Sequence, residues 1–304
     1  MLLAVIALGQ VRIARATAGA PVRTASLVPT PELLSSLEQS LTPVRRGEAV
    51  SDAVMSRISE AALRLNDDLL ERTVREAAAG ARLVTWSETA GRVIASEEQQ
   101  FVDEARQLAA QHGIVLILGL GVWRPDETPP FENKVVAIDA AGEVVWEFYK
   151  ARPIIGAESP FITAGDGLVT SVELDIGRVG SVICHDLDFP SLMRQASREE
   201  IALLVAPSAD WPTIADMHAR MAVLRAVENG ATLLRPTSGG RSLAIDAHGR
   251  VTTRVDFPED VMVALVSPAS LRTVYGYVGD LFSWMCLFGL AALLVAVVKR
   301  RAAA

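Results

Sequence analysis

The chain has 304 residues, of which 50% are hydrophobic, 21% are charged and 5% are aromatic. This composition predicts one large domain or two small ones with a real core, and it excludes a disordered or low-complexity chain. The net charge is −7 and no stretch of the body is strongly basic, so nucleic acid is not an expected partner. The two cysteines and four histidines lack metal-ligand spacing, so neither a disulfide scaffold nor a metal site is expected.

The sequence begins with a short apolar segment, residues 1–19. Its apolar run, residues 1–9, is too short to cross a bilayer. It lacks a basic n-region and a clear A-x-A cleavage site, which argues against a signal peptide. The run is either an interfacial anchor or the end of a span whose earlier part lies outside this sequence, and the residues do not decide between the two.

Residues 20–270 alternate between strand and helix patterns, which indicates a single α/β domain with helices outside stacked sheets. Buried strands are predicted at 81–86, 114–121, 178–184 and 201–206. Helices are predicted at 51–79, 96–112, 191–197 and 216–229. No strand is followed by a G-x-G-x-x-G segment and there is no P-loop, so no nucleotide or other cofactor is expected. In the last of these helices, Met217, Met221 and Leu224 share one face and are expected in the core.

Two stretches of the domain resemble each other, residues 138–144 (IDAAGEV) and 245–251 (IDAHGRV). Each is predicted to form the turn of a β-hairpin. The similarity has two interpretations. Either both turns need a glycine with positive φ, or the two hairpins belong to a pseudo-symmetric layered sheet.

The C-terminal part predicts a membrane span. Residues 281–298 carry no charge and would rise about 27 Å as a helix, close to the thickness of the hydrocarbon core. Residues 271–280 are the predicted linker, and 299–304 form a basic tail. The positive-inside rule places this tail in the cytoplasm and the preceding domain outside it. The alternative is a buried core helix, which the continuous apolarity and the basic stop disfavour.

Three polar side chains stand at the ends of predicted strands, where α/β folds place reactive groups. They are Glu88, Lys150 and Cys184. Each alone has an ordinary explanation, as a loop carboxylate, a surface charge or a small core residue. Together they suit one chemistry, because a thiol nucleophile needs a base and a tetrahedral intermediate needs donors for its oxyanion. The Lys150 ammonium and the backbone N–H of His185 could supply those donors.

The residues around these three positions resemble the signature regions of the carbon–nitrogen hydrolase (nitrilase) superfamily. The resemblance lies in residues 86–88 (WSE), 149–150 (YK) and 184–190 (CHDLDFP), with further matches at 207–211, 220–230 and 235–240. It implies a four-layer αββα sandwich, here followed by one C-terminal transmembrane helix, and Cys-dependent amide cleavage or acyl transfer through a thioester. It also implies Glu88 as the general base and acid, Lys150 as the oxyanion stabiliser and Cys184 as the nucleophile.

Within the superfamily, the sequence is most similar to the catalytic domain of the apolipoprotein N-acyltransferases. Glu158 lies eight residues after Lys150, where that branch carries a second glutamate. The final span with its basic tail also matches that branch. The sequence departs from it in having at most nine apolar residues before the domain, where the branch has a bundle of transmembrane helices. His185 also stands where an aromatic residue is common.

Three functional hypotheses follow. The first is a membrane-tethered acyltransferase that moves a fatty acyl group from a phospholipid to an amine of a lipoprotein. It requires either that a membrane partner supplies the helix bundle or that the sequence is a fragment of a longer chain. The second is a membrane-anchored amidase that hydrolyses a small or peptidic amide. The third is a catalytically silent interaction domain. Self-association into a homo-oligomer is left open by all three.

Two neighbouring residues have expected supporting roles. Glu158 either orients Lys150 or lines the pocket, with a loop charge as the alternative. His185 is expected to contribute its backbone and not its imidazole, and Asp186 to cap the next helix and not to bind a metal.

Overall fold

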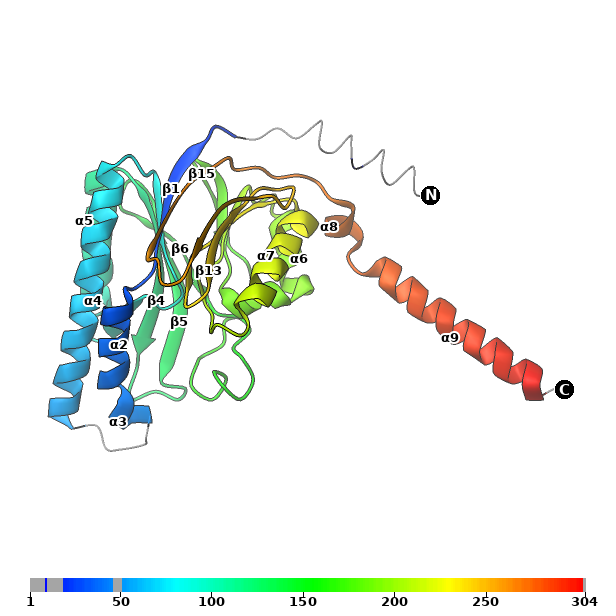
Figure 1. Cartoon of the computed structure of the whole chain (residues 1–304), viewed down its shortest axis with the longest axis horizontal. Helices are drawn as coiled ribbons and strands as arrows, with labels where there is room; N and C mark the ends of the chain where they lie inside the picture. The colour runs from blue at the N-terminus through cyan, green and yellow to red at the C-terminus, as the bar shows by residue number, and fades with distance from the viewer. Residues whose placement is uncertain (1–8, 10–18, 46–50, 303–304) are drawn as a thin grey trace.

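The computed structural model describes residue 9, residues 19–45 and residues 51–302, and it shows two central sheets covered by helices (Figure 1). The first sheet has the order β15-β1-β2-β4-β5-β6, with β3 beside β4. Its strands are β1 (Val22–Leu27), β2 (Leu83–Trp86), β3 (Gly91–Ile94), β4 (Val115–Trp123), β5 (Phe131–Ile138), β6 (Val144–Tyr149) and β15 (Val261–Val266).

The second sheet has the order β14-β13-β11-β9-β8-β7, and a separate short pair joins β10 to β12. Its strands are β7 (Ser171–Leu174), β8 (Gly177–Ser181), β9 (Leu203–Val205), β11 (Thr232–Arg235), β13 (Arg241–Ile245) and β14 (Val251–Asp256). The short pair consists of β10 (Ser208–Ala209) and β12 (Thr237–Ser238).

Helices lie outside both sheets. One side is covered by α2 (Pro31–Ser40), α4 (Asp52–Ala78) and α5 (Glu98–His112), with α3 (Thr42–Arg45) after α2. The other side is covered by α6 (Pro190–Arg198) and α7 (Ala215–Asn229). One apolar cluster joins the facing sides of the two sheets, and a second joins the first sheet to α2, α4 and α5. The predicted four-layer αββα sandwich is therefore confirmed.

The two similar hairpins lie in different sheets, β5–β6 in the first and β13–β14 in the second. Their turns are built alike: Asp139 Oδ1 accepts two backbone N–H groups, and Asp246 Oδ1 accepts the two equivalent ones, all at 2.9 Å. Gly142 and Gly249 have φ values of 82° and 83°. Both interpretations therefore apply, since each turn needs its glycine and each hairpin forms one edge of a matching layer.

Two local predictions were wrong. The strand predicted over 178–184 ends at Ser181, and Cys184 begins a short 3-10 helix, because the chain turns before the thiol. The face of Met217 and Leu224 is exposed, at 56% and 54%. On α7, alanines together with His218 and Arg225 make up the buried side, so the packing selects small and hydrogen-bonding residues in place of the longer apolar ones.

The C-terminal helix stands apart from the domain. Among the described residues, α9 (Leu281–Ala302) is the one helix long and apolar enough to cross a membrane, and none of its residues is buried. A core helix would bury its apolar side chains, so that alternative is wrong for this chain. The apolar segment predicted for 1–19 lies outside the described residues, apart from Gly9 and Gly19.

The predicted linker is held on the domain for most of its length. Within it, α8 (Val274–Val278) packs against α6 and α7. The Leu271 N–H donates to the Gly230 carbonyl at 2.7 Å, and Thr273 Oγ1 caps α8 by accepting from Gly276 N at 2.8 Å. Only Gly279 and Asp280 separate α8 from α9.

Gly119 in β4 allows the backbone after β2 to lie close to the sheet. A Cβ at this position would collide with the Ser87 carbonyl and would lie 3.2 Å from Glu88 Cα. We expect Gly119→Ala to lower the free energy of unfolding by about 1–3 kcal/mol, since overpacking against rigid backbone is not relieved by a rotamer change.

The measurement is thermal unfolding of the full chain in detergent, where this change corresponds to a fall in Tm of about 3–10 °C. Gly289→Ala in α9 is the control, because nothing lies within 4 Å of the added methyl group. Equal Tm values for the two variants would contradict the close approach.

Candidate active site

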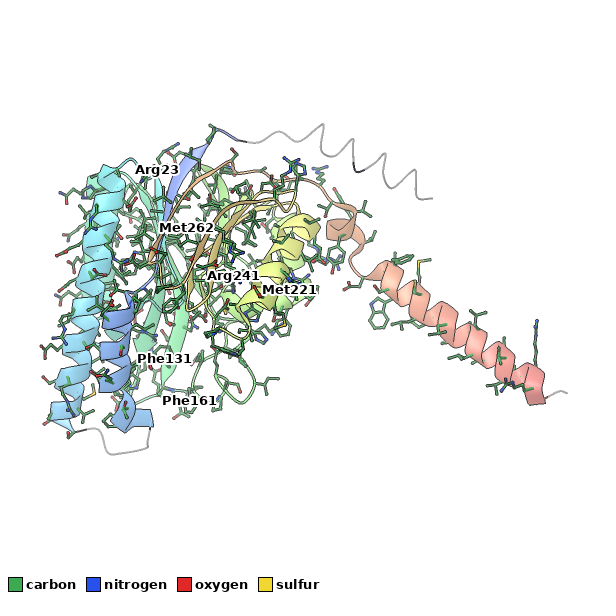
Figure 2. All side chains as sticks on the ribbon, viewed as in Figure 1. Arg23, Phe131, Phe161, Met221, Arg241 and Met262 are labelled. Carbon is green, nitrogen blue, oxygen red and sulfur yellow. The ribbon has the colours of Figure 1, made fainter. Side chains whose placement is uncertain are left out.

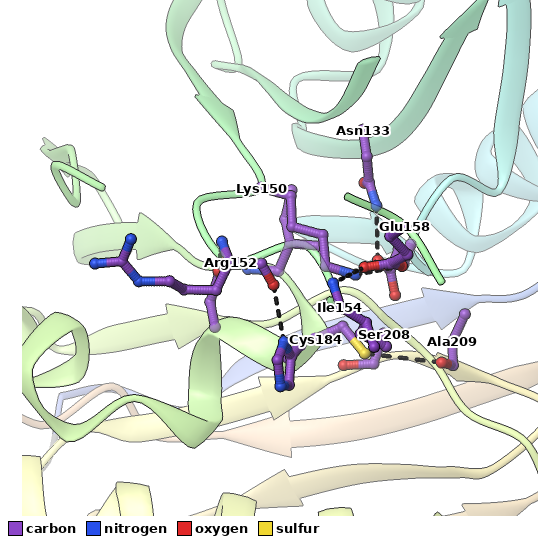
Figure 3. A network of polar contacts seen from close by, with 12 residues as sticks. Asn133, Lys150, Arg152, Ile154, Glu158, Cys184, Ser208 and Ala209 are labelled. Carbon is purple, nitrogen blue, oxygen red and sulfur yellow. Dashed lines mark hydrogen bonds and ion pairs between the residues drawn. The ribbon is translucent and has the colours of Figure 1, made fainter. Parts of the chain in front are cut away.

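Cys184 lies three residues after the end of β8, in a turn that has an unusual backbone conformation. Its φ is 45°, the left-handed region that L residues seldom occupy and that costs on the order of 1–3 kcal/mol. The Cys184 N–H donates to the Pro207 carbonyl at 2.9 Å, and Sγ lies 3.7 Å from the Ala209 carbonyl oxygen (Figure 3). The side chain is 4% exposed. The turn therefore fixes the thiol in one direction at the carboxyl end of the strand.

Asp186 holds this turn to the turn that follows β6. Its Oδ2 accepts from Ile183 N at 3.0 Å and from Ala151 N at 3.4 Å, and its Oδ1 accepts from Arg152 N at 2.7 Å. Burial raises the pKa of Asp186 to about 6, although these backbone donors oppose the rise. Asp186 thus caps the 3-10 helix that contains it and not the next helix, α6, whose N-cap is Phe189, so that part of the prediction was wrong. It also connects the backbone beside Lys150 to the backbone beside Cys184.

Glu88 follows β2 and is 5% exposed. Its Oε1 accepts from Asn133 Nδ2 and from Lys150 Nζ, both at 2.7 Å. The next residue, Thr89, has a φ of 47°, so the chain turns sharply directly after the carboxylate. Both donors therefore hold the carboxylate through Oε1.

Lys150 follows β6 and is completely buried. Its Nζ lies 2.7 Å from Glu88 Oε1 and 2.7 Å from Glu158 Oε1, and its backbone N–H donates to the Asn133 carbonyl at 2.9 Å. Burial alone would lower the pKa of Lys150, but the carboxylates of Glu88 and Glu158 outweigh it and raise the pKa above its usual value. The side chain is therefore an ammonium held between two carboxylates (Figure 3).

Glu158 is drawn into the site and is not a free loop charge. Besides Lys150 Nζ, it contacts the backbone of its own loop, where Ile154 N donates to Oε2 at 2.8 Å. The structure therefore brings together Glu88, Lys150 and Glu158 as one ion cluster.

The surroundings of Cys184 shift the pKa of its thiol. Burial raises this pKa and the Glu88 carboxylate raises it further, whereas Lys150 lowers it. The resting thiol consequently carries its proton.

His185 uses its imidazole for structure. Its Nδ1 lies 2.8 Å from the Arg152 carbonyl oxygen, and its ring packs edge-on against Phe189 with centroids 5.1 Å apart. The Arg225–Glu228 pair also forms, and Arg225 Nε donates to the Leu187 carbonyl at 2.6 Å. This pair holds the 3-10 helix after Cys184 against α7.

Sequence reasoning missed four polar residues of the site: Asn133, Asp210, His218 and Arg235. Asn133 lies inside β5, where a buried amide in an apolar strand was the available signal. Asp210 and Arg235 lay within segments matched to the family, although no role was assigned to them. In the structure Arg235 Nη2 contacts both Asp210 oxygens, at 2.9 and 3.1 Å, and His218 Nδ1 lies 2.9 Å from Asp210 Oδ1.

A metal ligand set can be drawn from the same residues. Ligand atoms of Cys184, Asp210 and His218 lie within 4.8 Å of one another. The Asp210 carboxylate is engaged by Arg235 and His218, and these contacts lower its pKa although burial opposes them. A carboxylate that already balances a buried guanidinium is a poor cation ligand, so we interpret the three as a hydrogen-bonded wall beside the thiol.

A small hollow of about 200 Å³ opens in front of this cluster, and we call it the catalytic hollow. Glu88, Ala209 and Asp210 line its inner end, and Leu34 of α2 and Arg92 of β3 line its outer part. Lys150 contacts Glu88, and Cys184 Sγ contacts the carbonyl of Ala209, so the ammonium and the thiol each adjoin a residue that lines the hollow. A carboxylate, an ammonium and a thiol gathered in this way can support attack on an acyl carbon, with proton transfer and oxyanion stabilisation.

Comparison with known proteins agrees with this geometry. A family model described as carbon-nitrogen hydrolase matches residues 11–275, which is most of the chain. The chain belongs to the carbon–nitrogen hydrolase family. Membership makes Cys184, the buried thiol at the strand end, the candidate nucleophile of an enzyme.

The sequence relatives of this carbon–nitrogen hydrolase chain include apolipoprotein N-acyltransferases. Apolipoprotein N-acyltransferase from Geobacter metallireducens is 27% identical over 257 residues, covering 77% of this chain and 49% of its own length. The protein of the same name from Rhizobium rhizogenes is 27% identical over 248 residues, covering 72% of this chain and 45% of its own. The chain thus spans about half the length of these relatives.

The solved structure of an amidase from Nesterenkonia sp. has the same fold, with a TM-score of 0.62 and 19% identity. The match covers 84% of this chain and 93% of the amidase.

The raised pKa of Asp186 predicts a pH-dependent stability. A carboxyl whose folded pKa lies near 6 and whose unfolded value is 3.8 binds more protons when folded, so its contribution is full below about pH 4 and is lost as the pH rises through 6. Over this window the wild type should lose up to about 3 kcal/mol relative to Asp186→Asn, which cannot titrate.

Thermal unfolding in detergent between pH 4.5 and 7 measures this difference. We expect the Tm of the wild type to fall relative to that of Asp186→Asn by about 5–10 °C across the window. Parallel curves, whatever their offset, would show that Asp186 does not titrate in this range.

Proposed function

We propose that this chain is a membrane-anchored enzyme that transfers a fatty acyl group from a phospholipid ester to an amine through a thioester on Cys184. The observation that carries the proposal is the thiol in a left-handed turn beside the Glu88–Lys150 pair. Three features add support: the helix α9 that could cross a membrane, the relatives named apolipoprotein N-acyltransferase, and the second glutamate on Lys150.

In the first half-reaction, Cys184 Sγ attacks the ester carbonyl of the donor. We assign the thiol proton to Glu88 Oε2, since the donors from Asn133 and Lys150 both lie on Oε1. Negative charge develops on the carbonyl oxygen, where the Lys150 ammonium and the backbone N–H of His185 stabilise it. The intermediate collapses to a thioester, and the leaving lysophospholipid alkoxide takes the proton from Glu88.

In the second half-reaction, an amine attacks the thioester carbonyl. Glu88 accepts a proton from the attacking nitrogen, the oxyanion forms again in the same place, and the carbon–sulfur bond breaks. The departing thiolate recovers its proton from Glu88, which returns the site to its starting state. An N-terminal amine of a lipoprotein is the acceptor that the named relatives suggest.

Glu158 and Asn133 act as positioning residues in this scheme. The Lys150 ammonium contacts Glu88. Without a second carboxylate, Glu88 would be the sole counter-ion of Lys150 as well as the base. Glu158 supplies that carboxylate and leaves Glu88 able to exchange a proton. Asn133 holds the Glu88 carboxylate with its side chain and the Lys150 backbone with its carbonyl, so one residue sets the spacing of both.

The location that goes with this function is a membrane with the catalytic domain on the extracytoplasmic side. The basic residues Lys299, Arg300 and Arg301 at the end of α9 support it. We also propose a membrane partner that holds the lipid donor. A homo-oligomer is a further arrangement that the proposal accommodates.

The second candidate function is a membrane-anchored amidase, in which water takes the acyl group from the thioester. The observation that favours it is the fold match to nearly the whole chain of a solved amidase. A silent interaction domain is disfavoured, because Glu88, Lys150 and Glu158 remain in contact beside an intact thiol.

Intact-mass analysis of the detergent-solubilised chain incubated with phospholipid tests the proposal. We expect a fatty-acyl adduct that hydroxylamine removes, present on the wild type and absent from Cys184→Ala. Glu88→Gln, which keeps the shape of the side chain, should slow adduct formation about 10²–10⁴-fold. If well-folded wild type forms no adduct but hydrolyses simple amides, the amidase is the better assignment.

The role of Asn133 gives a second test. Asn133→Ala removes a hydrogen bond to a buried carboxylate, so thioester formation should slow about 10- to 100-fold. The matched control is Asn229→Ala, another buried asparagine, whose Nδ2 donates to the Arg225 carbonyl at 3.0 Å, away from Glu88. Both variants should lose stability, and equal rates for the two would refute the positioning role.

A further inference from the structure

An apolar cavity of about 520 Å³ lies between α2, α4 and the part of the first sheet formed by β3, β4 and β5. Apolar side chains from the α2 region, α4, β3 and the loop after β6 form most of its wall, among them Leu37, Leu41, Ile58, Ala62, Val93 and Phe161. The mechanism proposed above uses none of these side chains. The cavity is larger than the catalytic hollow and differs from it in chemical character, since charged groups line it only at its edges.

The cavity adjoins the proposed active site through two residues. Glu158 lines the cavity, and its Oε1 lies 2.7 Å from Lys150 Nζ. Arg92 of β3 lines both the cavity and the catalytic hollow. Helix α2 runs along both as well, with Leu34 at the hollow and Leu37 at the cavity. The two spaces therefore share a wall, and Glu158 links the cavity to Lys150.

The loop that carries Glu158 forms the other side of the cavity. Phe161 in this loop lines the cavity yet is 57% exposed, which places it at the mouth. The loop is fixed to the start of β5, where Phe131 N donates to the Phe161 carbonyl at 3.1 Å and Thr163 N donates to the Phe131 carbonyl at 3.1 Å. Figure 2 shows Phe131 and Phe161 near one another at this end of the sheet. One short loop thus borders the cavity and positions Lys150.

We propose that this cavity binds the hydrocarbon chain of the acyl group that is transferred to Cys184. The inference rests on the proposed function and adds where the acyl chain lies. A methylene group takes up about the volume of a water molecule in the liquid, about 30 Å³, so the cavity has room for on the order of fifteen methylenes. The apolar wall excludes water from the chain, and the shared residues Arg92 and Glu158 place the carbonyl end toward the thiol.

The proposal predicts that the enzyme discriminates between acyl donors by the length of their hydrocarbon chain. Each methylene that leaves water for an apolar pocket tightens binding up to about fourfold, so a long acyl chain gains far more from the cavity than a short one. Filling the cavity should therefore affect long-chain donors alone. Ala62→Phe is the variant, since Ala62 is partly buried and its side chain lines the cavity from α4.

Thioester formation on Cys184 is measured by intact mass with p-nitrophenyl palmitate and p-nitrophenyl butyrate in mixed micelles. We expect Ala62→Phe to slow the palmitoyl reaction about 10- to 100-fold and to leave the butyryl reaction within twofold of the wild type. Ala78→Phe is the control, because it adds the same side chain at an exposed position of the same helix. Ala78→Phe should leave both reactions unchanged. It shows whether an added phenylalanine alters the reactions only through contact with the micelle.

The outcomes distinguish failure of the acyl-binding cavity from failure of the thioester mechanism. An equal loss with both esters, or no loss with either, would overturn the cavity as the acyl site while leaving the thioester mechanism intact. No thioester on the wild type with either ester would overturn the proposed function, and the acyl site with it.

Direct labelling gives a measurement that does not depend on turnover or on the folding of the Ala62 variant. Palmitic acid with a mid-chain diazirine is photolysed with Cys184→Ala, and the labelled peptides are mapped. Labels in residues 31–43 of the α2 region, in α4 or around Phe161 support the assignment. Labels confined to α9, or to the exposed face of α7, would overturn it.

Discussion

The buried ammonium of Lys150 is the constraint on which the rest of the site depends. An ammonium with no exposed surface is stable only when opposite charge and hydrogen bonds replace the lost hydration. Glu88 and Glu158 supply that charge from two different parts of the chain, one after β2 and one in the loop after β6. Removing Lys150 would leave two carboxylates without their shared counter-ion, so the three side chains must assemble together. The fold around them is the means of bringing β2, β6 and the loop to one place.

A second ionic cluster lies beside the thiol. Arg235, Asp210 and His218 are all buried, and their contacts bring together β11, the residue after β10 and helix α7. Cys184 thus lies between a cluster that can exchange protons and a cluster whose charges are already balanced. This asymmetry fits the proposed proton transfer from the thiol to Glu88. The strained turn at Cys184 is tolerated because Asp186 and the Pro207 carbonyl hold the backbone from both sides.

The sequence was informative wherever one local pattern determines the outcome. Glu88, Lys150 and Cys184 each follow a predicted strand, so their convergence could be predicted before any coordinates, whereas the four layers were what the family resemblance implied. Asn133 could not be predicted, because its partner Glu88 lies 45 positions away and nothing local selects it. The end of β8 was misplaced for a related reason: Val182 and Ile183 are as buried as strand residues, but the left-handed turn at Cys184 is set by long-range bonds. The exposed side of α7 was also assigned wrongly, since the buried polar residues His218 and Arg225 compete with Met217 and Leu224 for the inner face.

The short connection between α8 and α9 has a consequence for how substrates are found. Two residues, Gly279 and Asp280, can span no more than about 7 Å, and α8 is docked on the domain. With α9 in a bilayer, the catalytic domain could neither drift away from the lipid surface nor sample the bulk solvent. The domain would then meet its partners by diffusion in the plane of the membrane. The rate of these encounters would depend on the number of partners per unit of membrane area. Such an enzyme would respond to the crowding of its leaflet and remain indifferent to the same molecules dissolved in the aqueous phase.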